Sequence, residues 1–209
     1  MKNQKTRYAF IGALLALFAV VSQFYLNLTV QEEPKWMIVL RYFSYFTMVS
    51  NLLVGLHLGA LALPTGTKRW PRYTSPLVST AMTTYITITM IVYYVMLAKD
   101  ANPQGFQAII NLTLHLFVPL FMIVFWVLFV EKKDLQWKMV GRWLLTPLVY
   151  FIYAMVLGAF IDKYPYPFFQ VDVHGWTRVI ITALIILGFF GIMGMTYIGI
   201  GKILGSRKR

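Results

Sequence analysis

Apolar runs long enough to cross a lipid bilayer dominate this chain and leave few folds open to it. Hydrophobic residues make up 59% of the 209 residues, whereas charged residues make up only 12%. A run of about 18 or more apolar residues is typical of a transmembrane helix, because a helix satisfies its own backbone hydrogen bonds within lipid. The pattern predicts an all-α, polytopic membrane protein with a single domain over residues 1–209, and it excludes an ordinary soluble domain.

Six spans are predicted, with prolines near their ends. Pro34, Pro64, Pro76 and Pro103 punctuate the turns, as expected of residues that interrupt helices. The first span follows a basic N-terminus, but its apolar stretch is too long for a signal-peptide core and no small-residue cleavage pattern follows, so we expect it to remain as a helix. The six predicted transmembrane helices cover residues 8–28, 37–63, 74–98, 107–130, 143–161 and 177–200.

Basic residues gather in alternate connections between the spans, and this asymmetry orients the chain. Acidic residues mostly occupy the other connections, so every short connection agrees with the positive-inside rule. We therefore expect both termini to be cytoplasmic. The formal charge of +12 then indicates topology and contact with anionic lipid, and no nucleic-acid partner is predicted. The basic residues expected on the cytoplasmic side are Lys2, Lys5, Arg7, Lys68, Arg69, Arg72, Lys132, Lys133, Lys138, Arg142, Lys202, Arg207, Lys208 and Arg209.

The sequence shows no pattern typical of a metal site, a thiol enzyme or a repeat-based transporter. The chain contains no cysteine, and its three histidines, His57, His115 and His174, are far apart in sequence, so no metal and no cofactor are predicted. No internal repeat is visible, which argues against an inverted-repeat transporter. The longest outer connection, 162–176, is rich in aromatic residues and proline, which favours an interfacial cap or a re-entrant segment.

One histidine lies inside an apolar run that would otherwise be a simple span. His115 falls within residues 108–130, where an ionisable side chain costs about 2.5–3.5 kcal/mol on insertion scales and is by default a functional-site candidate. Asn111 precedes it by one helical turn and shares its helix face. At a rise of about 1.5 Å per residue, His115 lies roughly 12 Å from the outer end of its span.

A polar stripe in the second span is predicted to reach the same depth. Arg41, Ser44, Thr47 and Asn51 are spaced by three, three and four residues, which places them along one face of a continuous helix. Ser44 and Thr47 then lie roughly 10–15 Å from the outer end of their span, level with His115. An imidazole at that level could accept the proton of either hydroxyl and activate it as a nucleophile.

The other polar residues of the two spans fit supporting roles. Asn51 or Asn111 is expected to orient the imidazole or to donate to an oxyanion, and Arg41 is expected to hold a carboxylate or a lipid headgroup. The structural alternative is that hydroxyl residues merely link helices and that Arg41 is an interfacial anchor. Gly55 and Gly59 form a G-x-x-x-G pair that permits close helix contact. The hydroxyl residues of the third span that we expect to serve packing are Ser79, Thr80, Thr83, Thr84, Thr87 and Thr89.

Two stretches, RYFSYFTMVSNLL in the second span and NLTLHLFVPLF in the fourth, resemble the androgen-induced protein family of integral membrane proteins. That family includes the androgen-dependent tissue-factor-pathway-inhibitor-regulating protein and has bacterial relatives of this length. The outer stretch KYPYPFFQVDVHGW also resembles its Tyr-Pro-Phe segment. Eukaryotic members are hydrolases of fatty acid esters of hydroxy fatty acids, with a threonine nucleophile and a histidine. The resemblance implies His115 as the histidine and either Thr47 or Ser44 as the nucleophile, with Thr47 preferred because the residue type is kept.

Three hypotheses about function follow. The first is a multi-pass lipid ester hydrolase of the cell membrane, expected to be a bacterial inner membrane, in which Thr47 or Ser44 attacks and His115 is the base. Its predicted partner is a membrane lipid or fatty acid ester. The second is a non-catalytic lipid-binding protein or small transporter that uses the same polar cavity, and the third is a structural or partner-regulating subunit. The distance from His115 to the two hydroxyls separates the third hypothesis from the other two, because general-base catalysis needs hydrogen-bonding reach or one bridging water.

Overall fold

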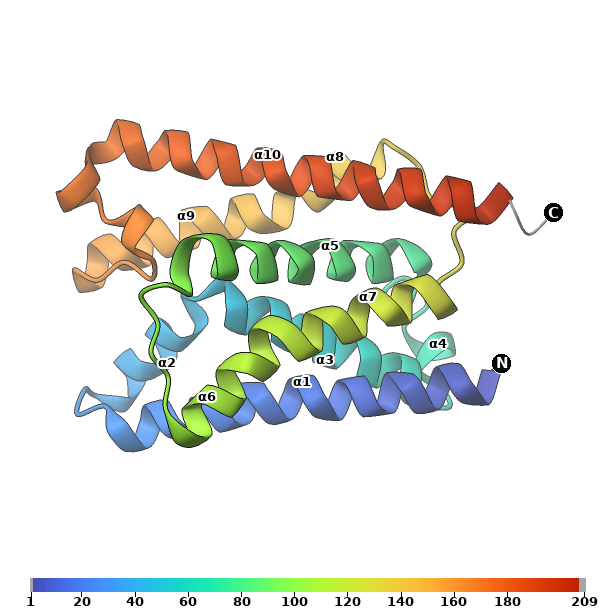
Figure 1. Cartoon of the computed structure of the whole chain (residues 1–209), viewed down its shortest axis with the longest axis horizontal. Coiled ribbons are helices and arrows are strands. Elements are labelled where there is room, and N and C mark those ends of the chain that lie inside the picture. The colour runs from blue at the N-terminus through green and yellow to red at the C-terminus, as the bar shows by residue number, and fades with distance from the viewer. Residues whose placement is uncertain (1, 207–209) are drawn as a thin grey trace.

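The computed structural model describes residues 2–206 and contains helices but no strand within that range. The long helices lie side by side along one axis (Figure 1). Short π-helical segments, η1 and η2, and one 3-10 turn, η3, interrupt or join them. In chain order the elements are α1 (Lys2–Val30), α2 (Lys35–Phe43), α3 (Phe46–Ala62), α4 (Gly66–Arg69), α5 (Pro76–Val92), η1 (Tyr93–Leu97), α6 (Gly105–Leu112), η2 (Thr113–Phe117), α7 (Val118–Phe129), α8 (Met139–Trp143), α9 (Leu145–Ile161), η3 (Pro167–Phe169) and α10 (Val171–Ser206).

Five helical segments are each long and apolar enough to cross a membrane, and the pair of α2 and α3 makes a sixth if it is counted as one broken span. The prediction of an all-helical chain built from membrane-length helices is therefore confirmed. The last of these segments starts before its predicted boundary, because α10 continues across a non-helical Gly175 with φ 72° and ψ 156°. The five segments are Asn3–Val30, Pro76–Leu97, Gly105–Phe129, Met139–Ile161 and Val171–Gly205.

The second predicted span is not one continuous helix. α2 ends just before Ser44, the following Tyr45 is extended with φ −88° and ψ 122°, and α3 begins at the next residue. The two helices are bent by 77° at this break. The prediction of one polar face was therefore wrong, because the bend separates the first two of its members from the last two. The four residues of that predicted face are Arg41, Ser44, Thr47 and Asn51.

A tyrosine of α9 satisfies the backbone groups that the break frees. The Tyr150 hydroxyl donates to the Ser44 carbonyl oxygen at 2.6 Å and accepts a hydrogen bond from the Phe46 N–H at 3.1 Å. The Ser44 hydroxyl donates to the Arg41 carbonyl oxygen at 2.7 Å. Unpaired backbone groups cost several kcal/mol in lipid, so non-helical backbone is tolerated at this depth where other groups pair with it.

Small residues bring α1 and α3 into close contact. Ala13 and Ala16 of α1 are buried where they face α3. A Cβ atom added at Gly55 would lie 2.9 Å from Leu17, closer than real Cβ contacts, whereas one added at Gly59 would meet Ala13 at an ordinary 3.9 Å. The predicted G-x-x-x-G pair thus lies at a helix–helix contact, and Gly55 is the member that the contact requires.

The hydroxyl groups of α5 pair with their own helix and with its neighbours. The Trp126 indole N–H donates to the Thr80 hydroxyl at 2.8 Å, and the Thr87 and Tyr197 hydroxyls lie 2.8 Å apart. The prediction that these residues serve packing and hydrogen bonding is confirmed. The side chains that donate to the carbonyl four residues earlier are those of Ser79, Thr80, Thr83, Thr84, Thr87 and Thr89.

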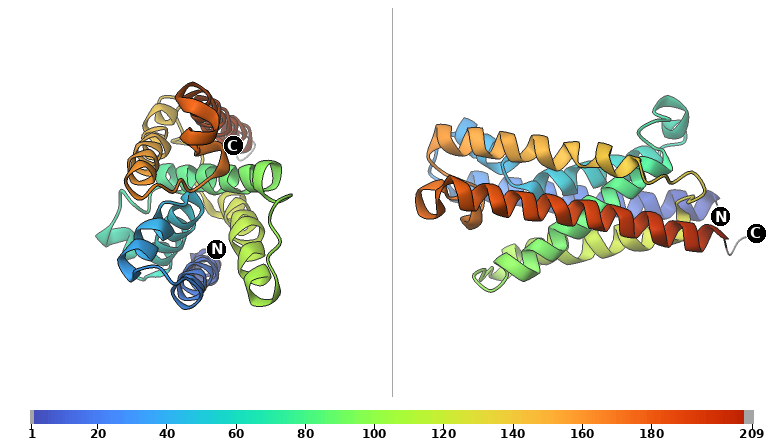
Figure 2. Two further views of the ribbon diagram at one scale, coloured as in Figure 1. Left: turned by 90° about the vertical axis from the view of Figure 1, so that its left-hand side faces the viewer. Right: turned by 90° about the horizontal axis from the view of Figure 1, so that it is seen from above.

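α5 lies in the middle of the molecule, with α1, α3 and α7 on one side and α9 and α10 on the other (Figures 1 and 2). α1 begins and α10 ends at the end of the bundle that carries α4, which we call the α4 end (Figure 1). The connections 98–104 and 162–170 lie at the opposite end, beside α2, which we call the α2 end (Figure 1). Three of the basic residues predicted to be cytoplasmic, Arg207, Lys208 and Arg209, lie outside the described residues.

Candidate functional site

The hydroxyl of Thr47 and the imidazole of His115 meet inside the bundle. Thr47 Oγ1 lies 3.3 Å from His115 Nε2, at the long end of hydrogen-bonding distance. Each side chain is only 7% exposed. Thr47 is the second residue of α3, and His115 lies in the π-helical segment η2, so the pair joins two elements that are 68 residues apart in sequence.

The hydrogen bond of His115 Nδ1 determines which tautomer of the imidazole is present. His115 Nδ1 lies 3.0 Å from the backbone carbonyl oxygen of Asn111, which can only accept a hydrogen bond. We therefore assign the proton to Nδ1, which leaves the lone pair of Nε2 directed at the Thr47 hydroxyl. In this tautomer Thr47 donates and His115 accepts, the arrangement that general-base catalysis requires.

Tyr93, in the segment η1 that follows α5, stacks on the imidazole of His115. The ring of Tyr93, in η1, lies on the His115 ring with centroids 3.7 Å apart and planes inclined by 15°. The Asn111 side-chain amide donates to the Tyr93 hydroxyl at 2.5 Å. Both stacked rings lie in π-helical segments, which occur mostly as single turns and frequently at functional sites. Of the two asparagines expected to orient the imidazole, Asn111 is the one that contacts it, through its backbone carbonyl oxygen.

Asn51 supports the site from the next turn of α3. Its side-chain amide donates to the Thr47 carbonyl oxygen at 2.8 Å and to the Leu114 carbonyl oxygen at 3.3 Å, which links α3 to η2 beside His115. Asn51 is fully buried, and its Oδ1 has no hydrogen-bond partner among the described residues. The Asn51 NH2 group therefore donates to two backbone carbonyls, and these hydrogen bonds hold together the two elements that carry Thr47 and His115.

Ser44 and Arg41 lie apart from the Thr47–His115 pair. The Ser44 hydroxyl is turned toward the Arg41 carbonyl, and the Arg41 guanidinium forms an ion pair with Glu33. Lys163 also donates to Glu33, at 3.1 Å. Of the two hydroxyls that the sequence left open, Thr47 is the one that faces His115, because the break in the second span turns Ser44 away.

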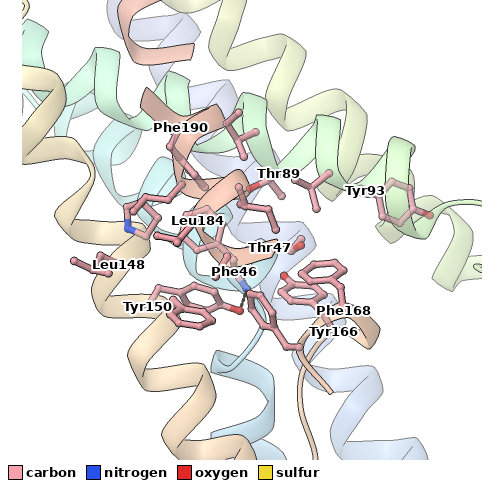
Figure 3. A pocket seen from close by; sticks show the side chains of 18 of the residues that line it. Phe46, Thr47, Thr89, Tyr93, Leu148, Tyr150, Tyr166, Phe168, Leu184 and Phe190 are labelled. Carbon is pink, nitrogen blue, oxygen red and sulfur yellow. Dashed lines mark hydrogen bonds between the residues drawn. The ribbon is translucent and has the colours of Figure 1, made fainter. Parts of the chain in front are cut away.

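An apolar cavity of about 130 Å³ lies against Thr47 (Figure 3). Its walls come from α3, α5, η1, α9, α10 and the connection 162–170, and they are mostly aromatic and aliphatic. Thr47 contributes a polar group to the wall, and His115 lies behind Thr47 outside the lining.

Two tyrosines that the sequence analysis did not single out flank Thr47. Tyr150 accepts a hydrogen bond from the N–H of the first residue of α3, and the Tyr166 hydroxyl lies close to the Thr47 side chain. Figure 3 shows the Tyr166 side chain at the cavity wall, with its hydroxyl end near Thr47. The aromatic composition of the connection 162–176 was the signal for Tyr166, since it predicted a segment folded onto the bundle. No sequence pattern marked Tyr150 or Tyr93.

A second histidine–hydroxyl pair lies nearer the α4 end. His57 Nε2 lies 2.9 Å from the Ser79 hydroxyl, and His57 Nδ1 lies 3.0 Å from the Tyr73 carbonyl oxygen. His57 and Ser79 are buried and take no part in the lining of the apolar cavity, so they join α3 to α5 without access to it. Within residues 2–206 no group of three or more metal-ligating side chains comes together.

No family model, no curated protein and no solved structure matches this chain. The fold and the site define a helical protein with membrane-length helices, an internal apolar cavity and a threonine–histidine pair at the cavity wall.

Proposed function

We propose that this protein is an integral membrane ester hydrolase in which Thr47 is the nucleophile and His115 is the general base. The observation that carries the proposal is the 3.3 Å separation of Thr47 Oγ1 from the unprotonated His115 Nε2. A threonine hydroxyl is a weak nucleophile until a neighbouring base removes its proton. The Asn111 carbonyl takes the place of an orienting residue, because it holds the imidazole in the tautomer that can accept.

In the proposed reaction the Thr47 proton passes to His115 Nε2 as Oγ1 bonds to the ester carbonyl carbon. The carbonyl π electrons move onto the carbonyl oxygen and return as the bond to the alcohol oxygen breaks, and His115 gives its proton to that oxygen. The product is an alcohol and an acyl-threonine. Water then attacks the acyl carbon and gives a proton to His115. His115 passes that proton to Thr47 Oγ1 as the acyl–oxygen bond breaks, which restores the hydroxyl and releases a free fatty acid as the second product.

The proposed substrates are fatty acid esters, such as fatty acid esters of hydroxy fatty acids. The apolar lining of the cavity supports an acyl chain as its occupant, and the resemblance to the androgen-induced protein family supports the ester class. Leu148 of α9, with Ile180 and Leu184 of α10, line the cavity and are 41%, 45% and 60% exposed on the outside of the bundle. We infer that a lipid reaches Thr47 sideways between these two helices.

The proposed setting is the cell membrane, with six spans and both termini cytoplasmic. The connections at the α4 end carry most of the basic residues, including Lys68, Arg69 and Lys138, as the positive-inside rule expects of a cytoplasmic face. Thr47 and His115 then lie in the half of the bilayer nearer the α2 end, and the ester group is drawn from the outer leaflet.

The test is hydrolysis of a fatty acid ester of a hydroxy fatty acid by the purified protein, beside labelling with a fluorophosphonate probe. Thr47→Ala and His115→Ala are each expected to lower kcat/KM by more than about a hundredfold, since nucleophile and base act as one unit. Ser44→Ala is the matched control, because it removes a buried hydroxyl that faces Arg41. Full activity in His115→Ala would overturn the mechanism.

A lipid-binding protein without catalysis is the second candidate, and the position of His115 outside the cavity lining is the observation that favours it. In that case Thr47 would present only a hydroxyl to a bound lipid. Lipid that co-purifies with the wild-type protein, together with no turnover and no fluorophosphonate labelling, would support this candidate over the hydrolase.

A further inference from the structure

Tyr166 is the residue of the outer connection that reaches the Thr47 site. Its side chain is buried, with its ring stacked on Phe168 at 5.1 Å and packed edge-on against Tyr45 at 5.7 Å. Its hydroxyl lies close to the Thr47 side chain, to the Tyr150 hydroxyl and to the backbone of Phe46 and Thr47. Two ring contacts therefore hold one hydroxyl against the proposed nucleophile.

The first turn of α3 supplies backbone donors at the same place. Phe46 and Thr47 are its first two residues, and N–H groups in a first turn have no acceptor within their own helix. The Phe46 N–H is taken by the Tyr150 hydroxyl at 3.1 Å. The Thr47 N–H lies close to the Tyr166 hydroxyl, so two neutral donors lie beside the side chain of the proposed nucleophile.

When Thr47 attacks an ester, negative charge develops on the ester carbonyl oxygen, close to Oγ1. The ester carbonyl oxygen is bonded to the same carbon that Oγ1 attacks, so the oxyanion develops two bonds away from Oγ1. Among the described residues no lysine, arginine or histidine lines the cavity. The charge must therefore be met by neutral donors, whose effect is large in an apolar site from which water is excluded.

The other hydroxyl groups of the lining are committed elsewhere. The Tyr150 hydroxyl donates to the Ser44 carbonyl oxygen, and the Thr89 hydroxyl lies 3.0 Å from both the Tyr85 carbonyl oxygen and the Ser50 hydroxyl. The Tyr93 hydroxyl accepts from Asn111 on the side of the imidazole. Tyr166 is thus the lining residue whose hydroxyl is directed at Thr47.

We propose that the Tyr166 hydroxyl and the Thr47 backbone N–H form the oxyanion hole of the hydrolase. The inference rests on the proposed function. As Oγ1 bonds to the carbonyl carbon, the carbonyl π electrons move onto oxygen, which accepts one hydrogen bond from Tyr166 and one from the Thr47 N–H. Neither donor loses its proton, and both bonds weaken when the carbonyl re-forms and the alcohol leaves.

The test compares Tyr166→Phe with wild type and with Tyr197→Phe. The control removes another buried tyrosine hydroxyl, which pairs with Thr87 away from the cavity. Tyr166→Phe keeps the ring and its packing, so the fold is expected to persist. Because one oxyanion donor is worth about 10²–10³ in kcat, we expect a fall of that size with KM changed little, and no fall in the control.

A second measurement separates this role from a structural one. A long-chain trifluoromethyl ketone adds to the nucleophile as a tetrahedral oxyanion, whereas the matching ether binds without reacting. Tyr166→Phe is expected to weaken ketone inhibition by the same factor as kcat and to leave ether binding unchanged. A fluorinated tyrosine at position 166, with its more acidic hydroxyl, is expected to retain tight ketone binding, which keeps the test decisive if Tyr166→Phe unfolds.

Each outcome decides between the two proposals. Equal loss of ketone and ether binding in Tyr166→Phe, or wild-type kcat in that variant, would overturn the oxyanion role and leave the Thr47–His115 mechanism standing. Failure of the wild-type protein to hydrolyse any ester or to bind the ketone would overturn the proposed function, and the oxyanion role with it.

Discussion

A single carboxylate at the α2 end joins segments that are far apart in the chain. Glu33, between α1 and α2, accepts hydrogen bonds from Arg41 of α2 and from Lys163, which follows α9. These two cations hold the pKa of the Glu33 carboxyl below its ordinary value. Because the carboxyl has a lower pKa in the folded protein than in the unfolded chain, its contribution to stability is full above the unfolded pKa of about 4.3 and is lost as the pH falls through the lower folded pKa.

We therefore expect Glu33→Gln to lower the Tm by about 2 °C at neutral pH, the scale of a partly exposed ion pair in a chain of this size. The difference from wild type should shrink as the pH falls below about 4, where the wild-type carboxyl is itself protonated. Thermal unfolding in detergent at a series of pH values measures this difference in Tm. Glu32→Gln makes the same charge change at an exposed neighbour and should leave the Tm unchanged. A pH-independent difference would contradict the ion-pair explanation.

At the same scale, the sequence located Thr47 and His115 as candidates because an ionisable side chain in an apolar run is costly and depth can be counted along a helix. It could not choose between Ser44 and Thr47, because both lie at nearly the same depth. Arg41 was expected either to hold a carboxylate or headgroup or to be an interfacial anchor, and in the structure it pairs with Glu33 across a turn. The spacing of residues along one helix does not show which residue of the preceding connection will contact that helix.

At the scale of the elements, the break between α2 and α3 depends on Tyr150. We expect Tyr150→Phe to lower the free energy of unfolding by about 1–3 kcal/mol, because the Ser44 carbonyl and the Phe46 N–H lose their partner in an apolar setting. Unfolding in a mixed-micelle denaturant series measures the change. Tyr153→Phe is the matched control, since Tyr153 is on the same helix, is 37% exposed and makes a 3.3 Å hydrogen bond.

Equal stability of Tyr150→Phe and Tyr153→Phe would mean that the break is held by packing alone. That result would assign the bend to the ring contacts of Phe46, which include Tyr150 at 4.9 Å and Phe190 at 5.4 Å. A larger loss in Tyr150→Phe assigns it to the two hydrogen bonds.

The breaks and π-helical segments are the part of the elements that the sequence did not predict. The run across Ser44 and Tyr45 contains neither glycine nor proline, so its composition gives no reason to end a helix there. Thr113–Phe117, where His115 lies, also contains neither, but Pro119 follows it and cannot donate the backbone hydrogen bond that the His115 carbonyl would accept in a regular helix. Their stability comes from tertiary partners such as Tyr150 and Tyr93, which are distant in sequence.

At the scale of the whole molecule, length and hydropathy were enough to predict the membrane-length helices but not their arrangement. Span helices are apolar on most of their faces, so periodicity does not show which face meets which neighbour. Two local departures from an all-apolar sequence did indicate how helices are placed. The predicted G-x-x-x-G pair lies where α3 meets α1, and the hydroxyl-rich segment 76–92 is the central helix α5. The cavity is built from six elements, and no one of them marks it in sequence.

The orientation of the whole bundle can be tested directly because the chain has no cysteine, so one introduced thiol is the only one present. Thr67 lies in α4, Ala101 lies in the connection after α5, and both are exposed. With basic connections retained in the cytoplasm, a membrane-impermeant maleimide should label Ala101→Cys in intact cells and Thr67→Cys only after permeabilisation. Ala154→Cys, at a fully buried position of α9, is the unlabelled control.

The two exposed positions flank a single crossing by α5, so they must react from opposite sides of the membrane whatever the orientation. The reverse pattern would place the basic α4 end outside and put Thr47 in the inner leaflet, where an ester from the outer leaflet could not reach it. Labelling of both positions in intact cells would contradict α5 as a span. The predicted pattern fixes the leaflet from which the cavity is filled, and the side on which a fatty acid ester should be offered in the hydrolysis test.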